Sequence, residues 1–140
     1  MLTDPFGTSA LTRRIIGCAI RVHAVIGPGV LENVYSECLQ QELREERLAF
    51  EVARAVPIVY KGVTLKSLYY LDLVVENLVV VELKVIAGFA EIHRRQVLTY
   101  LKLTGLPVGL LLNFNVEMLT NGGVKRIINP SYKQLVANKD

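Results

Sequence analysis

The segment Leu78–Val85, which reads Leu-Val-Val-Val-Glu-Leu-Lys-Val, is the strand around which the predicted fold is built. Its run of valine and leucine predicts a strand that is covered on both faces of a sheet. Glu82 and Lys84 interrupt the run. Because residues two apart in a strand point to the same face, their side chains project side by side. Charged side chains are rarely buried without partners, so the pair predicts either a structural ion pair or a hydrated cleft that uses both charges.

The composition indicates an ordered globular protein. Its 140 residues, 51% of them hydrophobic and 21% charged, suit one domain with one core. No apolar run approaches the length of a membrane-spanning helix, and residues 1–8 lack the features of a signal peptide, so a cytoplasmic location is expected by default. The net charge of +3 permits an anionic ligand without indicating one. Cys18 and Cys38 are expected to be buried thiols, with a disulfide as the alternative.

Hydrophobic periodicity predicts helices and strands in a definite order. A helix is expected from a cap at Thr8 or Ser9 to about Ile26, and a second from about Val30 to Glu46, after the Gly27–Gly29 break. A third helix is expected over about Ala90–Leu103, with Ile92, Val97 and Leu101 facing inward. The expected strands are Phe50–Tyr60, Val63–Val75, Leu78–Val85, Val108–Asn113 and Val124–Ile128. The polar segment 131–140 is expected to be frayed or a short helix.

This order predicts an α/β fold with a mixed sheet. The first three strands are joined by short turns and form an antiparallel meander. The strand after the third helix can return parallel to a neighbour, so the fold is an antiparallel meander plus a crossover strand, flanked by helices. Pro57 suggests that the first strand lies at an edge or contains a bulge.

A third charged residue, Asp72, lies ten residues before Glu82 on the preceding strand, and the length of the loop decides whether they meet. With a two-residue loop (76–77), Asp72 points away from Glu82. With a three-residue loop (75–77), Asp72 pairs with Val80 and shares a face with Glu82. Asn77 tolerates the left-handed conformation that the third position of such a loop requires. We therefore expect an odd-length loop, with the Cβ atoms of Asp72 and Glu82 as diagonal neighbours about 7 Å apart.

The three charged residues on one face suit metal-dependent chemistry. A divalent cation can bridge two carboxylates at this separation, and Mg²⁺ takes one or two carboxylates together with several waters. Such an ion polarises a phosphoryl oxygen and lowers the pKa of a bound water, and a nearby lysine stabilises the charge that develops on phosphorus. Asp72, Glu82 and Lys84 are therefore a sufficient set for phosphodiester hydrolysis. A buried salt bridge is the structural alternative.

These residues resemble a known signature. Asp72 followed by Glu82-Leu83-Lys84 is similar to the D…(D/E)xK signature of the PD-(D/E)XK nuclease superfamily, although Leu71 stands where a proline is usual. Gly29-x-x-Glu32-x-x-Tyr35 matches the motif of the GxxExxY protein family, a small single-domain branch of that superfamily. Segments 92–101, 109–114 and 125–127 also resemble that family. The resemblance covers about residues 15–129, nearly the whole chain.

The resemblance implies roles for particular residues. Asp72 and Glu82 would be metal ligands, Glu32 would add a third carboxylate, Lys84 would be the catalytic lysine, and Gln96 would orient substrate or water. The weaker candidates for substrate contact are His93, Tyr100 and Arg94. From spacing alone, a favourable charge at a helix N-terminus is the simpler interpretation of Glu32. Ordinary helix surface positions are the alternative for Gln96 and His93.

The resemblance also implies a restriction-endonuclease-like fold in one domain, residues 1–140. The implied activity is a nuclease that hydrolyses phosphodiester bonds with a metal-activated water. Mg²⁺ or Mn²⁺ would be the cofactor. Nucleic acid would be the partner, with DNA favoured over RNA, no membrane would be involved, and a homodimer is left open. A catalytically silent module that binds nucleic acid or protein on the same fold is the alternative.

Overall fold

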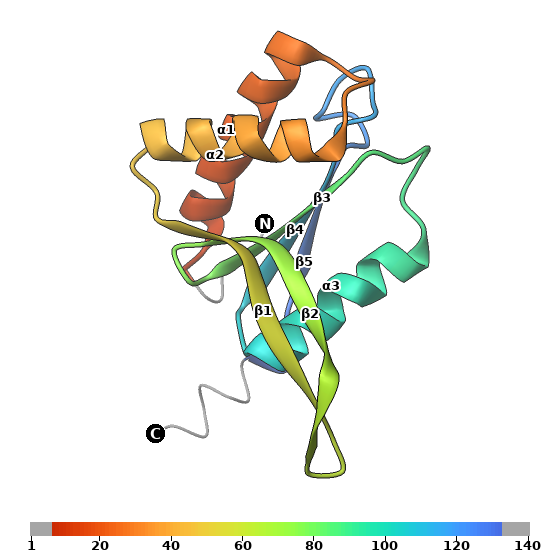
Figure 1. Cartoon of the computed structure of the whole chain (residues 1–140). Coiled ribbons are helices and arrows are strands. Elements are labelled where there is room, and N and C mark those ends of the chain that lie inside the picture. Colours follow the sequence, from red (N-terminus) through yellow and green to blue (C-terminus); the bar gives the residue numbers. More distant parts are fainter. Residues whose placement is uncertain (1–6, 133–140) are drawn as a thin grey trace.

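The computed structural model describes residues 7–132, and the predicted helices and strands are all present there (Figure 1). In chain order they are α1 (Ser9–Ile26), α2 (Glu32–Glu45), β1 (Phe50–Tyr60), β2 (Val63–Val75), β3 (Val79–Lys84), α3 (Glu91–Thr104), β4 (Val108–Asn113) and β5 (Val124–Ile128). Four of the five strands have the predicted bounds, and β3 is one residue shorter at each end. The prediction for 131–140 lies almost entirely outside the described residues.

The five strands form one mixed sheet in the order β1-β2-β3-β4-β5. β3 and β4 are parallel, and the other neighbouring pairs are antiparallel. A parallel pair needs a crossover connection, and α3 provides it between β3 and β4. The expected α/β fold, an antiparallel meander plus a crossover strand, is thus confirmed and is consistent with a restriction-endonuclease-like fold.

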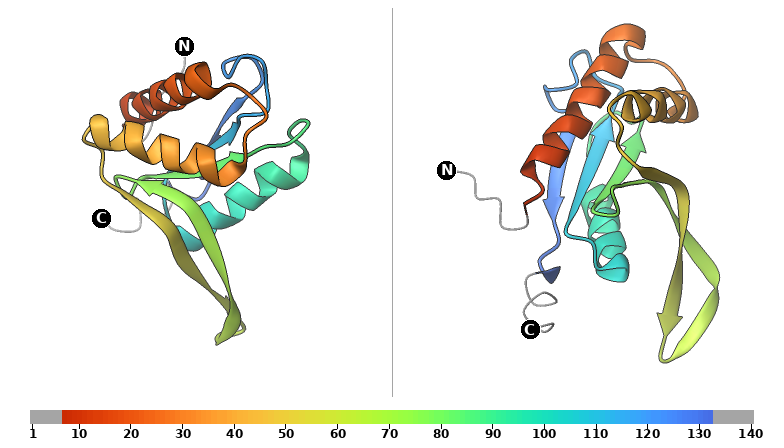
Figure 2. Two further views of the ribbon diagram at one scale, coloured as in Figure 1. Left: turned by 45° about the horizontal axis from the view of Figure 1, so that its top comes forward. Right: turned by 90° about the vertical axis from the view of Figure 1, so that its left-hand side faces the viewer.

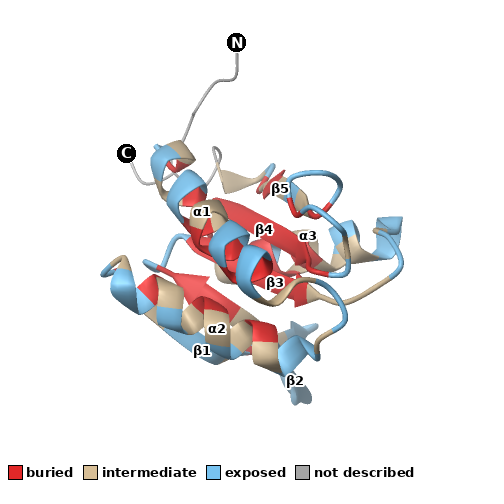
Figure 3. Cartoon of the chain, turned by 90° about the horizontal axis from the view of Figure 1, so that it is seen from above, coloured by how far each residue is buried: buried red, intermediate tan, exposed pale blue. Residues whose placement is uncertain are grey.

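The helices cover the two faces of the sheet in three layers (Figures 1 and 2). On one face, α1 and α2 pack against Val79, Val81 and Leu83 of β3. On the other, α3 packs against Val80 of β3 and Leu111 of β4. Figure 3 shows β3 and β4 as the most buried part of the molecule. Leu78–Val85 is therefore covered on both faces over most of its length, as its composition predicts.

α3 approaches the sheet closely because β4 has a glycine beneath it. A Cβ atom on Gly109 would lie 2.5 Å from Cγ1 of Val97 on α3. Val97 and Leu101 are fully buried, as predicted. Ile92, in the first turn of α3, was expected to face inward but is 68% exposed.

The distal half of the β1–β2 hairpin projects from the body as a two-stranded arm (Figure 2). Residues 63–70 of β2 are all exposed. The pairing register shifts between Pro57 and Val59, so Pro57 lies in an edge strand next to an irregularity, as expected. Cys18 is buried and Cys38 is half-buried, and both are free thiols. Within residues 7–132, no helix combines the length and apolarity needed to span a membrane.

Candidate active site

The β2–β3 hairpin brings Asp72 and Glu82 together. The pairing runs through Val75–Val79, Val74–Val80 and Leu73–Val81. Extended by one residue, this register sets Asp72 across from Glu82, at the point where the two strands separate. The loop contains three residues, so the predicted odd length is confirmed, but it spans 76–78 instead of 75–77. Glu76 and Asn77 both have positive φ angles, of 53° and 52°, and form a tight turn, after which Leu78 is the additional residue. The two carboxylates are therefore directly opposed, whereas the sequence predicted that they would be diagonal neighbours.

Asp72 lies at an irregular point of the sheet. Leu71 packs on the α3 side and Leu73 on the α1–α2 side, although regular strand residues two apart share a face. On the neighbouring strand, the paired positions pass from Val52 to Arg54 and omit Ala53, which lies across from Asp72. The φ angle of Ala53 is 52°, a conformation that costs a non-glycine residue roughly 1–3 kcal/mol. The backbone around Asp72 is thus held in an uncommon conformation.

The carboxylates occupy the gap where β2 and β3 separate. The backbone N–H of Asp72 donates to Oε1 of Glu82 at 3.1 Å, and the N–H of Leu83 donates to Oδ2 of Asp72 at 2.9 Å. Beyond Leu73–Val81 the strands no longer pair, and these side chains replace the backbone acceptors. Each carboxylate is thereby fixed through one oxygen atom.

Glu82 is only 3% exposed, and burial is the main reason that its pKa is raised to about 8. The charge of Asp72 and a hydrogen bond between the two side chains raise the pKa further. The backbone N–H of Asp72 and the charge of Lys84 act in the opposite direction. Two adjacent carboxylates without a full positive counter-charge therefore favour a shared proton.

Lys84 follows at the end of β3, half-buried and near both Glu82 and Glu32. Its register partner, Asn113, is 1% exposed and holds the chain after Lys84 in place. Asn113 accepts from the N–H of Ile86 at 3.1 Å and donates to its carbonyl at 3.0 Å. Asn113 had no predicted role, and its signal is a polar residue that ends a strand of buried leucines.

Glu32 is the first residue of α2, and its neighbours raise its pKa. Burial is the largest cause, the charge of Asp72 is the second, and Lys84 opposes them. The other two residues of its motif are structural. Gly29 has a φ of 91°, and the hydroxyl of Tyr35 donates to the Gly27 carbonyl and accepts from the Val30 N–H. Gly29 and Tyr35 thus shape the loop that presents Glu32 near Asp72.

The candidates on α3 lie in different surroundings. Tyr100 is 4% exposed, packs edge-on against Tyr69, and has its pKa raised to about 12, first by burial and then by the charge of Glu82. Gln96 opposes this rise through a hydrogen bond to Tyr100, so both lie on the Glu82 side of the sheet. His93 accepts the N–H of Ala90 through Nδ1 at 2.8 Å, and thus caps α3.

Arg94 does not join the carboxylate site in this structure. Its Nη1 lies 3.0 Å from Oε1 of Glu91, and both side chains are about half exposed. The structure therefore brings together Glu32, Asp72, Glu82 and Lys84, with Gln96 and Tyr100 nearby on α3. It places Arg94 and His93 in local contacts at the start of that helix.

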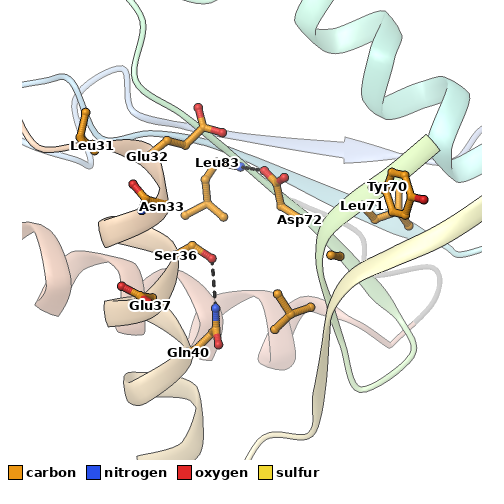
Figure 4. Close-up of a pocket in the computed structure, with 12 residues that line it drawn as sticks. Leu31, Glu32, Asn33, Ser36, Glu37, Gln40, Tyr70, Leu71, Asp72 and Leu83 are labelled. Atoms are coloured by element: carbon orange, nitrogen blue, oxygen red, sulfur yellow. Dashed lines mark hydrogen bonds between the residues drawn. The ribbon is translucent and has the colours of Figure 1, made fainter. Parts of the chain in front are cut away.

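A cleft of about 740 Å³ opens beside Asp72 (Figure 4). The N-terminal half of α2 forms one wall, and the irregular part of β1 and β2 forms the other. Glu32 stands at one end of α2 on the same side as Asp72. Glu32 and Asp72 are therefore accessible from a cavity of the size that commonly binds small molecules or parts of polymers.

The carboxylates of the site provide two of the oxygen ligands that a hard divalent cation such as Mg²⁺ needs. Within residues 7–132, no group of three or more His, Cys, Asp or Glu side chains is close enough to hold a metal ion. Mg²⁺ and Mn²⁺ accept two carboxylates and complete their coordination with water. Asp72 and Glu82 provide such a pair, and burial together with the charge of Asp72 raises the pKa of Glu82. Glu32 does not complete a cluster of three ligands in this conformation.

Comparison with protein families agrees with this geometry. A model of the PD-(D/E)XK nuclease superfamily matches residues 9–127, which is most of the chain. The chain belongs to the PD-(D/E)XK nuclease superfamily. The corresponding searches of curated proteins and of solved structures give no match. Asp72, Glu82 and Lys84 all lie within the matched region.

The cleft of this superfamily member also contains residues that the sequence did not single out. Asn33, Ser36 and Gln40 line it from α2, and Tyr70 lines it from β2. The available signal was the four-residue spacing of Glu32, Ser36 and Gln40, which places polar side chains on one helix face.

Proposed function

We propose that this protein is a metal-dependent nuclease of the GxxExxY type that hydrolyses phosphodiester bonds of nucleic acid with a metal-activated water. The observation that carries the proposal is the direct opposition of Asp72 and Glu82, cross-linked by hydrogen bonds at the point where β2 and β3 separate. A structural salt bridge is not supported, because Lys84 forms no ion pair within 4 Å among the described residues, whereas six pairs of other residues do.

The residues of the site have distinct roles in this proposal. Asp72 and Glu82 would hold Mg²⁺ or Mn²⁺, and Glu32 would bind a water of that ion. When bound, the ion polarises the phosphate and lowers the pKa of water. Lys84 would stabilise the negative charge that develops on the phosphate oxygens. Gln96 would orient the substrate or the attacking water from α3.

The test compares cleavage by matched variants. Single-stranded DNA, duplex DNA and RNA would be incubated with the protein in Mg²⁺, in Mn²⁺ and in excess chelator. Glu82→Ala and Lys84→Ala are expected to reduce cleavage by at least about a hundredfold, as loss of a charge-stabilising group typically does. Glu45→Ala and Lys102→Ala remove exposed charges outside the site and serve as controls. Cleavage that persists in both site variants would assign the activity to a contaminant.

The second candidate is a catalytically silent binding module, and the absence of a three-ligand cluster within residues 7–132 is the observation that favours it. Metal titration by calorimetry separates the two. Binding of Mn²⁺ that is lost in Glu82→Ala supports the nuclease, whereas nucleic-acid binding without metal binding supports the module.

A further inference from the structure

The cleft beside Asp72 adjoins the carboxylate site and carries no positive charge of its own among the residues that the structure describes. Its lining residues include the acids Glu32, Glu37 and Asp72, and among them there is no lysine, arginine or histidine. A phosphate group placed deep in this cleft would meet negative charge on several sides. The cleft is therefore suited to an uncharged part of a ligand, whereas the phosphate belongs at the metal site and Lys84.

The α2 wall offers both hydrogen-bond donors and acceptors. Nε2 of Gln40 donates to Oγ of Ser36 at 3.2 Å, which leaves the Gln40 carbonyl, its second N–H and the Ser36 hydroxyl hydrogen available. Asn33 makes no side-chain hydrogen bond to any residue in the part of the chain that the structure describes. Side-chain amides of this kind match the paired donors and acceptors on the edge of a nucleobase.

The opposite wall offers an aromatic surface. Tyr70 is 59% exposed, although it lines the cleft at the base of the β1–β2 arm, two residues before Asp72. Exposed tyrosine rings beside a backbone-binding site are suitable for stacking with bases. Figure 4 shows Tyr70 on the strand that carries Asp72, with the polar α2 side chains across the cavity.

We propose that this cleft binds one unpaired nucleobase of the strand whose phosphodiester lies at Asp72 and Glu82, so that the substrate is single-stranded at the site. The base stacks on Tyr70, and its edge faces the polar side chains of α2, where Ser36 and Gln40 offer hydrogen-bond donors and acceptors. A base inside a duplex has its edge paired and its faces stacked, and it reaches such a cleft only when it is unpaired or extruded. This inference rests on the proposed function, because that function supplies the phosphate position.

The test measures binding of labelled oligonucleotides by fluorescence anisotropy, in the Lys84→Ala background with Mg²⁺ so that the strand stays intact. Tyr70→Ala is expected to weaken binding of single-stranded DNA by about tenfold, and Tyr70→Phe to retain it. An oligonucleotide with abasic sites throughout should bind the Tyr70→Ala and parent proteins equally. Tyr60→Ala at the tip of the arm and Gln41→Ala on the exposed side of α2 are the matched controls.

Several outcomes would overturn the inference. Equal losses for Tyr70→Ala and Tyr60→Ala, or equal sensitivity of normal and abasic strands to Tyr70→Ala, would show that the cleft does not read a base. Duplex DNA that binds as tightly as single strands would do the same. If the otherwise unmodified protein cleaves nucleic acid but Tyr70→Ala binds single-stranded DNA as tightly as its parent, only this inference fails. If base-dependent binding occurs without any metal-dependent cleavage, the proposed hydrolysis fails and the base site remains.

Discussion

At the scale of single residues, Glu82 stands out as a buried carboxylate with a strongly raised pKa. Its side chain is 3% exposed and lies beside a second carboxylate, Asp72. Burial and the charge of Asp72 both destabilise the ionised form of Glu82, so its pKa rises to about 8. A purely structural role would be better served by an uncharged residue of similar size. The position is explained when a cation supplies the missing charge, and this explanation leads to a prediction in the absence of metal.

Glu82→Gln should stabilise the metal-free protein at neutral and alkaline pH. The folded-state pKa of about 8 exceeds the ordinary value of 4.5, so between these values the folded state binds more protons than the unfolded state. The stability from this group is fully present below about pH 4.5 and is lost as pH rises through 8. Chemical denaturation in chelator at pH 5, 7 and 9 should show a growing advantage of Glu82→Gln.

The control for this measurement is Glu45→Gln, which removes an exposed carboxylate from α2. Its stability should follow the profile of the unsubstituted protein. Parallel pH profiles for Glu82→Gln and that protein would contradict the raised pKa.

At the scale of elements, the loop before α2 explains why a glycine and a tyrosine accompany Glu32. The positive φ of Gly29 disfavours any other residue. Tyr35 is fully buried, stacks on Phe114 with ring centroids 4.4 Å apart, and binds the loop through its hydroxyl. The motif therefore consists of one residue that faces the site and two that position it.

Tyr35→Phe should keep the ring stacking but lose the hydrogen bonds to Gly27 and Val30. We expect a destabilisation of about 1–2 kcal/mol, because two backbone groups lose their partner. Urea denaturation measures this cost, and Tyr60→Phe, at an exposed position, is the control. The proposed activity should also fall in Tyr35→Phe, because the loop that leads into Glu32 loses the hydrogen bonds that hold it in place. A variant that is as stable as the parent would contradict this role.

Gly109→Ala should push α3 away from the sheet. The new Cβ would meet Cγ1 of Val97 at 2.5 Å, and a β-branched residue in a helix has little freedom to turn aside. We expect a destabilisation of about 1–3 kcal/mol, as for other overpacked cores. Adding Val97→Ala should recover part of this loss in a double-mutant cycle. Independent, additive effects of the two substitutions would show that this contact does not set the helix–sheet distance.

At the scale of the whole molecule, the site lies where the layers meet. α2 contributes Glu32, the β2–β3 hairpin contributes the carboxylate pair and Lys84, and α3 contributes Gln96. The acidic groups cluster only in the folded state, so a cation that bridges them should bind the folded chain alone and stabilise the whole fold.

Mg²⁺ or Mn²⁺ should therefore raise the melting temperature. At ten times the dissociation constant the gain is about 1.4 kcal/mol, which corresponds to roughly 3–6 °C for a domain of this size. Binding at pH 7 should also release a proton from Glu82, detectable by calorimetry in buffers of different ionisation enthalpy. Asp72→Asn should abolish both effects, and equal melting shifts in Asp72→Asn and the parent would assign the effect to another site.

Much of the fold could be predicted because the elements follow from local patterns. The alternation of strands, the glycine breaks and the odd loop near Asn77 all depend on residues close together in the chain. Two predictions were wrong. The loop spans residues 76–78 because the tight turn at Glu76 and Asn77 leaves Leu78 as the additional residue, and Ile92 is exposed although its spacing in the helix matched the inward face.

The sequence by itself determined the order of the elements, the mixed sheet and the three charged residues at one point of its hairpin. Alternating side-chain directions and turn chemistry are local properties, and the chain carries them in adjacent residues. Only the tertiary structure decided that Asp72 and Glu82 lie directly opposite each other, that Glu32 approaches them while Arg94 does not, and that Tyr70 and Gln40 face one cleft. Apart from the Asp72–Glu82 pair, which lies within one hairpin, these placements join segments tens of residues apart, and they depend on how the helices pack on a sheet that is irregular at Asp72.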